Sequence, residues 1–294
     1  MYAAEFDYHK ASSVAEAIQM LGQYPGAKLL AGGHSLLPML KLRLANPAAL
    51  IDISGISELK GITVNDGTVT IGALPTHQEI AASQDIQNAC MVVAEAAEGI
   101  GDPQVRNRGT IGGNVVHSDP ASDWPTVLTA LNARFVIQGP EGITHSASRT
   151  VSAGEFFKGL FETDLKENEV LTAIEVPRLN SNQLAEYAKM AHPASFYAVV
   201  GASVVITVEN DRCTAASIAV GGMVANPVRA SSVESALVGQ QLNAESVRAA
   251  ADLVANDLSG SLMGDFYASA NYRKAMAAVE TRHALMHAIG LAHH

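Results

Sequence analysis

The apolar and polar positions of the N-terminal third predict short helices and strands that alternate along the chain. Residues 13–22, "SVAEAIQMLG", carry apolar side chains at helical spacing, with Ser12 or Ser13 as the cap and Gly22 as the stop. The apolar runs "AKLLAG" and "ALIDIS" are typical of buried strands, and "SLLPMLKLRL" between them is typical of one or two helical turns. The alternation in "GITVNDGTVTIGAL" predicts a hairpin that turns at residues 65–67.

The middle of the chain predicts two longer helices, a second hairpin and a further strand. The alanine-rich stretch "IQNACMVVAEAAEG" predicts a helix that ends at Gly99. The stretch "DWPTVLTALNA" predicts a helix with Asp123 near its cap and Pro125 in its first turn, where proline is tolerated. We expect a hairpin in "RFVIQGPEGIT" and a strand in "EVLTAIEVP" that Pro177 closes.

A polar stretch at residues 179–185, "LNSNQLA", interrupts the pattern and predicts a domain boundary. Beyond it, two β-branched runs meet at residues 209–212, and helical patterns follow in "SSVESALVG", "NAESVRAAADLVAND" and "NYRKAMAAVETRHALMHAIG". This order is typical of a small α+β unit. We therefore expect a region at residues 1–178, with subdomains at about 1–57 and 58–178, and a C-terminal domain at residues 184–290.

Charge and cysteine content exclude several classes of function. The formal net charge is -10, and no basic stripe runs along the chain, which argues against a nucleic-acid partner. The chain has 2 cysteines, whereas a cysteine-ligated iron–sulfur cluster needs four thiolates, so the chain cannot hold such a cluster alone. The start "MYAAEFDYHK" lacks the regions of a signal peptide, and no uncharged stretch approaches the about 20 residues of a membrane span. We expect a cytoplasmic protein.

Two glycine pairs stand where a predicted strand or loop meets a predicted helix. A glycine lets the backbone approach a phosphate closely, and successive N–H groups in a tight turn can bind an anion. The hydroxyls of Ser35 and Thr110 and the amide of Asn114 can add hydrogen bonds. The first loop comprises Gly32, Gly33, His34 and Ser35, and the second comprises Thr110, Ile111, Gly112, Gly113 and Asn114.

One Gly-Gly pair by itself is usually only a turn, since glycine is common. Two such loops, without the lysine of a Walker loop or the spacing of G-x-G-x-x-G, point instead to two phosphates held from two sides. The sequence therefore predicts a dinucleotide site in a fold other than the Rossmann fold.

Four segments together resemble one known family over nearly the whole chain: "AGGHSLLPMLKLRL", "GDPQVRNRGTIGGN", "DPASDWP" and "NYRKAM". The chain resembles the FAD-binding medium subunits of the molybdenum hydroxylases, the xanthine oxidase family. It is most similar to the carbon monoxide dehydrogenase medium subunits and their aldehyde and N-heterocycle dehydrogenase relatives. The resemblance implies an α+β fold. It comprises a two-subdomain FAD-binding fold of the vanillyl-alcohol-oxidase/PCMH type, followed by a small α+β C-terminal domain.

The resemblance also implies which residues bind FAD without a covalent bond. Both glycine loops, from Ala31 to Ser35 and from Thr110 to Asn114, correspond to the pyrophosphate loops of the family. Asp123 corresponds to an aspartate at the adenosine or ribityl hydroxyls, and Leu171 to an apolar contact near the adenine. The remaining expected FAD contacts are Ile100, Lys189 beside the flavin and Tyr197 over the isoalloxazine face.

Without the resemblance, several of these residues have simpler interpretations. Asp123 is as well explained as a helix cap, Tyr197 as a core residue that opens an apolar strand, and Lys189 as a solvated charge. His34 either contacts the pocket or caps its own turn. His192 has no partner at metal-ligand spacing, so we expect no metal site.

One stretch departs from the family. Many relatives carry Arg-Arg-x-Gly-Asp where this chain has "KMAHPASFYA". The departure leaves open whether Lys189 and Tyr197 keep the usual flavin contacts, and it bears on how an external electron acceptor docks.

The family function implies partner chains. A large molybdopterin subunit hydroxylates the substrate, a small subunit relays electrons through [2Fe–2S] clusters, and the medium subunit passes them from FAD to an external acceptor. The expected assembly is a heterohexamer of two heterotrimers, and no catalytic acid or base is expected in this chain. The alternatives are a stand-alone flavin-dependent oxidase, which needs a substrate-binding cap, and a cofactor-free assembly subunit, which both intact glycine loops argue against.

Overall fold

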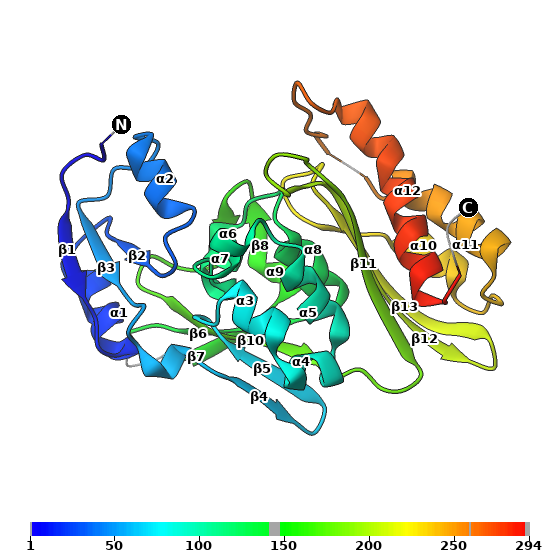
Figure 1. Cartoon of the computed structure of the whole chain (residues 1–294), viewed down its shortest axis with the longest axis horizontal. Coiled ribbons are helices and arrows are strands. Elements are labelled where there is room, and N and C mark those ends of the chain that lie inside the picture. Colours follow the sequence, from blue (N-terminus) through cyan, green and yellow to red (C-terminus); the bar gives the residue numbers. More distant parts are fainter. Residues whose placement is uncertain (1, 141–147, 259, 292–294) are drawn as a thin grey trace.

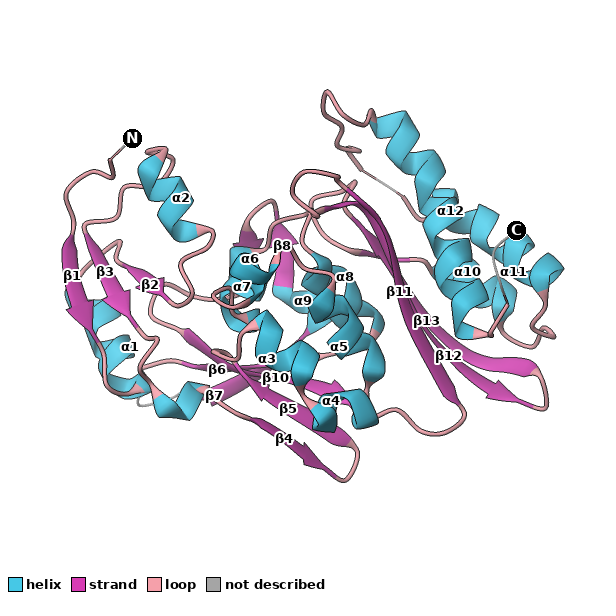
Figure 2. Cartoon of the chain, in the orientation of Figure 1, coloured by secondary structure: helices cyan, strands magenta, loops and turns pink. Residues whose placement is uncertain are grey.

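Among the described residues, three sheets of three or more strands follow one another along the chain, and each carries its own helices (Figure 1). The computed structural model describes residues 2–140, 148–258 and 260–291. In Figure 2 the central helices lie between the second and third sheets, and the last helices cover the outer side of the third sheet. No helix in these described stretches is both long and apolar enough to cross a membrane.

The first sheet is parallel, with strand order β1-β3-β2. Its helix α1 begins after Ser13, whose hydroxyl accepts a hydrogen bond from the N–H of Glu16, so the predicted helix and its cap are confirmed. The predicted stop at Gly22 is wrong, because the helix continues through Gly22 to Gln23. The two predicted strands and the intervening helix are confirmed as well. The elements are β1 (Asp7–Lys10), α1 (Val14–Gln23), β2 (Lys28–Leu30), α2 (Leu36–Lys41), β3 (Ala49–Asp52) and the 3₁₀ turn η1 (Ser57–Leu59).

The second sheet is antiparallel, with strand order β4-β5-β10-β6-β7. The predicted hairpin that turns at residues 65–67 joins β4 to β5, and Pro177 ends β10 as predicted. The turn predicted between β6 and β7 falls largely at residues 141–147, outside the described residues. The strands are β4 (Ile62–Asn65), β5 (Thr68–Gly72), β6 (Arg134–Gln138), β7 (Ser148–Ser152) and β10 (Val170–Pro177).

In the described part of this region, seven helices and the small hairpin β8-β9 accompany the sheet. The single helix predicted up to Gly99 is wrong, because the chain leaves helical geometry at Cys90, between α4 and α5. The break lets Ile86 before it and Val93 after it both reach the same core. The elements are α3 (His77–Ala82), α4 (Gln84–Ala89), α5 (Met91–Glu98), α6 (Pro103–Arg106), α7 (Ile111–His117), α8 (Asp123–Ala130), α9 (Ala153–Phe156), β8 (Phe157–Gly159) and β9 (Glu162–Thr163).

The third sheet is antiparallel, with strand order β11-β12-β13-β14. The two long runs that meet at residues 209–212 are confirmed as β12 and β13. The elements are β11 (Gln183–Ala191), β12 (Ala198–Glu209), β13 (Arg212–Gly221), β14 (Val228–Arg229), α10 (Ser231–Leu237), α11 (Ala244–Ala251), η2 (Asp252–Asn256) and α12 (Ala270–Ala288).

Strand β11 begins inside the polar stretch 179–185 and was not predicted. Every residue of β11 is half-buried, because α5 packs on the strand from one side of the sheet and α12 packs on it from the other. A strand with this environment on both faces has no alternation of apolar and polar residues for a sequence pattern to detect.

The first two sheets meet through a backbone contact between the two glycine loops. A Cβ added to Gly32 would lie 1.9 Å from the carbonyl oxygen of Arg108, and one added to Gly112 would lie 2.6 Å from the carbonyl oxygen of Ala73. Within the second region, the Gly112 contact and a short antiparallel bridge between Thr76 and Thr110 hold the segment before α3 against the second loop. The first glycine of each pair is therefore required by chain packing, before any ligand is considered.

Helix α8 packs on β12 and β13, and so connects the second sheet to the third. On the other side of that sheet, the buried guanidinium of Arg273 on α12 donates to the carbonyl oxygens of Val199 and Gly222 at 3.0 and 2.7 Å. It also donates to the carboxylate of Asp265 at 2.5 Å. The "NYRKAM" motif thus ties α12 to the start of β12.

We expect Gly32→Ala and Gly112→Ala each to destabilise the chain by more than about 2 kcal/mol. The added Cβ would overlap backbone atoms, and these can make room only if the backbone itself moves. The comparison is Gly22→Ala on α1, where an added Cβ meets no atom within 4 Å and improves helix propensity. Urea denaturation of the cofactor-free chain measures the difference. Equal stability of the three variants would contradict the packing role.

Candidate functional site

A cavity of about 630 Å³ opens where the three sheets meet. The first sheet contributes the loop after β2, the second contributes the loop before α7 and the start of α8, and the third contributes residues 194–197. Volumes of this size are typical of sites for small molecules and cofactors. The cavity is therefore the candidate binding site.

The first glycine loop forms one wall of the cavity. Gly33 has φ +77°, a left-handed conformation that a residue with a Cβ adopts only with strain. The ring of His34 lines the cavity, and its Nδ1–H donates to the carbonyl oxygen of Gly32 at 3.4 Å. This histidine therefore both contacts the pocket and caps its own turn. Ser35 precedes α2 without a side-chain capping bond, which leaves its hydroxyl available to the cavity.

The second glycine loop differs from the sequence prediction. Its N–H groups are already used: Ile111 donates to Pro75 at 3.1 Å, Gly112 to Ala73 at 2.9 Å, and Gly113 to the Thr110 hydroxyl oxygen at 3.2 Å. The expectation of an anion nest of free N–H groups in this loop is therefore wrong. Binding groups in this loop come from side chains.

Thr110 and Asn114 supply those side chains. The Thr110 oxygen accepts from Gly113, so its O–H remains free to donate. The Asn114 side-chain oxygen accepts a hydrogen bond from the Ser122 hydroxyl, so the amide N–H groups are the part of this side chain left to bind a ligand. Both residues line the cavity.

Asp123, the first residue of α8, holds a buried polar cluster at the back of the cavity. Its Oδ1 accepts from Lys189 Nζ at 2.8 Å and from the Tyr187 hydroxyl at 2.7 Å, and both partners come from β11. Burial raises the pKa of Asp123, and the ammonium of Lys189 acts against this shift. The interpretation of Asp123 as a helix cap is wrong, because Ser122 occupies the cap position.

Lys189 connects three segments of the cavity wall and is not a solvated charge. Besides Asp123, its ammonium donates to the carbonyl oxygen of Gly99 at 2.8 Å and to that of Phe196 at 2.9 Å. Gly99 precedes the cavity residues Ile100 and Gly101, and Phe196 lies in the loop that closes one side. The three donor positions of an ammonium group are thereby all used within the protein.

The turn from β11 to β12, residues 192–197, forms the third wall. Its ends are joined by the hydrogen bond from the N–H of His192 to the carbonyl oxygen of Tyr197 at 2.8 Å. The His192 ring packs against Tyr267 at a centroid distance of 4.5 Å, and no group of three or more metal-ligating residues occurs in the described part of the chain. Tyr197 lines the cavity with 42% of its surface exposed, so it is not a core residue.

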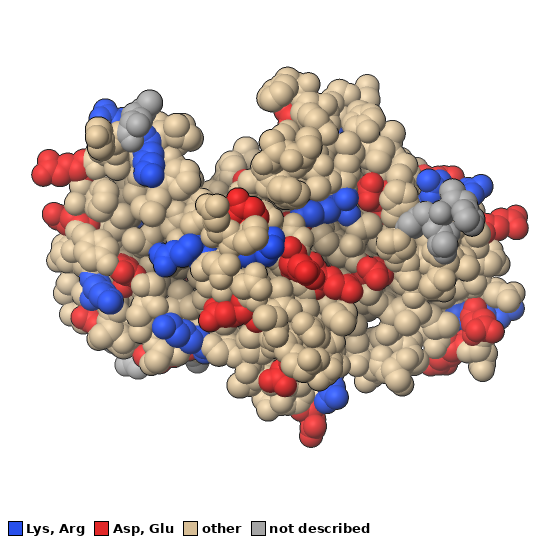
Figure 3. All heavy atoms as spheres, viewed as in Figure 1, with Lys and Arg blue, Asp and Glu red and all other residues tan. Residues whose placement is uncertain are grey.

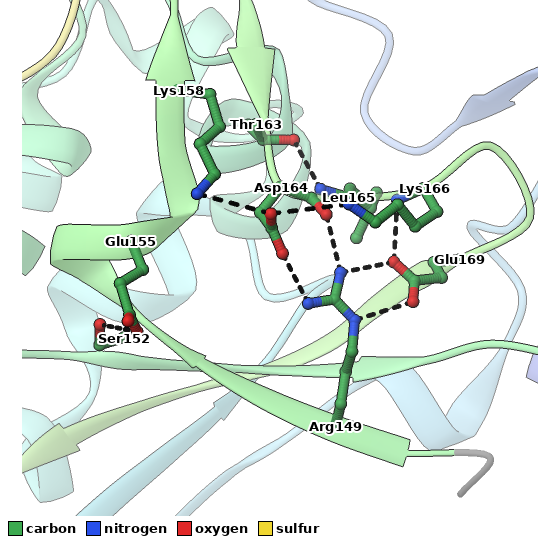
Figure 4. Close-up of polar contacts among 9 residues, drawn as sticks. All are labelled: Arg149, Ser152, Glu155, Lys158, Thr163, Asp164, Leu165, Lys166 and Glu169. Carbon is green, nitrogen blue, oxygen red and sulfur yellow. Dashed lines mark hydrogen bonds and ion pairs between the residues drawn. The ribbon is translucent and has the colours of Figure 1, made fainter. Parts of the chain in front are cut away.

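The opposite wall is apolar and is held in place by an ion-pair cluster (Figure 4). Leu165, Val170 and Leu171 line it. Arg149 on β7 donates two hydrogen bonds to the Glu169 carboxylate, at 2.8 and 2.7 Å. It also donates to the carboxylate of Asp164 at 2.6 Å and to the carbonyl oxygen of Asp164 at 2.7 Å. These bonds fix the segment that leads from β9 into β10, which carries the apolar wall.

The cavity brings together most of the residues that the sequence singled out. Two of them do not line it: Ile111 is fully buried beneath the second loop, and Lys189 acts through Asp123. The predicted residues that line the cavity are Ala31, Gly32, Gly33, His34, Ser35, Ile100, Thr110, Gly112, Gly113, Asn114, Asp123, Leu171 and Tyr197.

Sequence reasoning missed three polar residues of the site. Tyr187 lies on the unpredicted strand β11, and Ser122 became relevant only through its bond to Asn114. His77 follows Thr76, which forms a capping box with Glu79 at the start of α3. The T-x-x-E spacing was visible in the sequence, but its position against the second glycine loop was not.

Comparisons with known proteins identify the family of each of the two regions. The family described as "FAD binding domain in molybdopterin dehydrogenase" matches residues 4–179, and the family described as "CO dehydrogenase flavoprotein C-terminal domain" matches residues 185–288. These matches confirm the α+β fold with an FAD-binding region followed by a C-terminal domain.

The chain is similar in sequence to several medium subunits over almost its full length. It is 41% identical to the carbon monoxide dehydrogenase medium chain of Hydrogenophaga pseudoflava, covering 97% of each chain. It is 37% identical to the glyceraldehyde dehydrogenase medium chain of Sulfolobus acidocaldarius, covering 96% of this chain and 97% of that one.

Solved structures give the same result. A carbon monoxide dehydrogenase structure from Hydrogenophaga pseudoflava matches with a TM-score of 0.93 at 41% identity, covering 98% of this chain and 99% of that one. Quinoline 2-oxidoreductase from Pseudomonas putida 86 matches with a TM-score of 0.91 at 30% identity, covering 98% of both chains. The chain therefore belongs to the FAD-binding medium subunits of the molybdenum hydroxylase family.

Proposed function

We propose that this chain holds FAD in the cavity between its two glycine loops and works as the electron-exit subunit of a molybdenum-containing hydroxylase or dehydrogenase. Electrons would arrive from the [2Fe–2S] clusters of a small partner subunit and leave to an external acceptor. The observation that carries the proposal is that both glycine loops line one cavity, to which all three sheets contribute.

The residues of the cavity fit FAD because they supply hydrogen-bond donors for a diphosphate and an apolar wall for a ring. The hydroxyls of Ser35 and Thr110 and the amide of Asn114 line the cavity, where they would donate hydrogen bonds to a diphosphate. The apolar wall with Leu171 suits a planar ring, and Ile100 and Tyr197 flank the other end. FAD, when bound, supplies the redox chemistry, and the chain positions it and shields it from water.

The rim of the cavity supports docking of a partner near the cofactor. Three aromatic residues line the cavity and remain exposed at the same time: Phe161 at 53%, Phe196 at 47% and Tyr197 at 42%. Exposed apolar groups that gather at one place favour protein contact. On the face shown in Figure 3, acidic and basic side chains are interspersed among uncharged surface, which does not favour a nucleic-acid partner.

The small number of cysteines supports the proposal that the iron–sulfur clusters lie in another subunit. Cys90 and Cys213 are both free and buried, and the chain has no others, so clusters and molybdopterin would reside in a small and a large partner chain. We propose a heterohexamer of two heterotrimers in the cytoplasm, where buried free thiols remain reduced. We also propose residues 1–178 and 184–290 as the domain limits.

The first prediction concerns cofactor retention. Gly113→Val places a branched Cβ at the cavity wall, 2.8 Å from the Thr110 oxygen, and Gly33→Val adds strain at φ +77°, so we expect both variants to lose FAD. The flavin-to-chain ratio after gel filtration, read from absorbance, measures the loss. Gly22→Val on α1 is the control that retains FAD, and full occupancy of both loop variants would refute the two-loop site.

The second prediction concerns Lys189. Its side chain is 13% exposed and that of Asp123 is 4% exposed, so Lys189→Met leaves a buried carboxylate unpaired and should cost about 3–5 kcal/mol of unfolding free energy. The double variant Lys189→Met with Asp123→Asn should recover a large part of that loss. Urea denaturation measures the unfolding free energy of each variant. If the loss in the double variant equals the sum of the losses caused by the two single substitutions, the two groups do not interact.

The third prediction concerns electron transfer. Under anaerobic conditions, the isolated small subunit reduced with dithionite and freed of excess reductant should bleach the visible band of FAD on this chain within seconds of mixing. The chain alone, offered aldehydes or N-heterocycles, should show no bleaching. Bleaching by a substrate without partner subunits would favour a stand-alone oxidase, and a chain that cannot be loaded with FAD would favour an assembly subunit.

A further inference from the structure

His77 is a buried histidine between the two glycine loops. It is the first residue of α3, and its backbone N–H donates to the carbonyl oxygen of Gly109 at 3.0 Å, directly before the second loop. The side chain lines the cavity, although only 2% of the residue is exposed. Its position is therefore set by backbone contacts and does not depend on a flexible loop.

The indole of Trp124 determines which nitrogen of His77 carries the proton. Trp124 Nε1–H donates to His77 Nδ1 at 3.2 Å, and an indole can only donate. A neutral imidazole that accepts at Nδ1 carries its hydrogen on Nε2. Burial, with the nearby charges of His34 and Arg106, lowers the pKa of His77 to about 4, so the ring stays neutral above that pH.

The Nε2–H group lies beside Gly109 at the cavity wall. A Cβ on Gly109 would lie 2.9 Å from Nε2, so any larger residue at this position would crowd the ring at Nε2. Among the described residues, Trp124 is the one hydrogen-bond partner of the His77 ring, and it occupies the other nitrogen. With no partner among the described residues, this N–H group is left to donate to a ligand oxygen in the cavity.

The charges of the cavity make a neutral donor useful at this place. Of the described residues that line it, Lys28 is the sole lysine or arginine, while Asp102 and Asp123 are acidic. A diphosphate held here must therefore be bound largely by neutral N–H and O–H groups. His77 supplies one from beside Gly109, directly before the second loop.

We propose that His77, held by Trp124 as the Nε2–H tautomer, donates a hydrogen bond to the pyrophosphate of FAD and is a third element of the pyrophosphate site. This inference rests on the two-loop site proposed above. It assigns a binding role to a residue outside both loops.

The test compares two variants of the full chain, freed of its cofactor and titrated with FAD and with ADP, which shares the diphosphate. His77→Phe keeps a ring but removes the donor, and we expect the dissociation constants of both ligands to rise about ten-fold or more, as for a lost hydrogen bond to a charged group. His77→Gln places an amide donor at a similar reach and should stay within about three-fold of the native chain.

Two results would overturn the inference: His77→Phe binding both ligands as tightly as the native chain, or Phe and Gln variants equally weakened, which would indicate a packing role. If the native chain and the His77→Phe variant bind FAD equally tightly, the inference about His77 fails but the proposed function stands. A native chain that binds neither FAD nor ADP would refute the proposed site and this inference together.

A second measurement does not depend on the folding of variants. In the native chain with ¹⁵N-labelled histidine, the Nε2–H resonance of His77 should show the neutral tautomer and should shift when ADP is added. The Nδ1 resonance, bonded to Trp124, should change less. An Nδ1–H tautomer, or an Nε2 signal indifferent to ADP, would refute the proposal.

Discussion

The structure depends on the close approach of two backbone segments, the loop after β2 and the loop before α7. At Gly32 the chain passes so near the carbonyl oxygen of Arg108 that a Cβ would lie 1.9 Å from it. This contact joins the first sheet to the second and brings both glycine pairs to one cavity wall. Within each pair, packing requires the first glycine, and both glycines line the cavity.

The polar groups around the cavity divide into those that hold the protein and those left for a ligand. The N–H groups at the start of α7 and all three donor positions of Lys189 are used internally. Buried polar groups in proteins are nearly always paired, so this use is expected for a site that keeps its shape without a ligand. The hydroxyls of Ser35 and Thr110, the amide of Asn114 and Nε2 of His77 remain, and all are neutral donors.

The third sheet takes part in the site through one strand and one turn. Lys189 on β11 reaches Asp123 on α8 and two carbonyl oxygens, and the turn that follows β11 places Tyr197 at the cavity. The stretch "KMAHPASFYA" therefore contributes to the wall by the ammonium of Lys189, by packing and by backbone carbonyl groups.

The sequence by itself determined the helices and strands with clear periodicity, both glycine loops, the absence of iron–sulfur ligands and the family, because these depend on local pattern and on residue type. The tertiary structure alone decided that β11 is a strand, that the helix near Cys90 breaks, and that Asp123 binds Lys189 and Tyr187. It also decided that His77 enters the site. Each of these depends on partners more than 40 residues away in sequence or on burial of both faces of a strand. The local sequence pattern predicts neither distant partners nor burial on both faces.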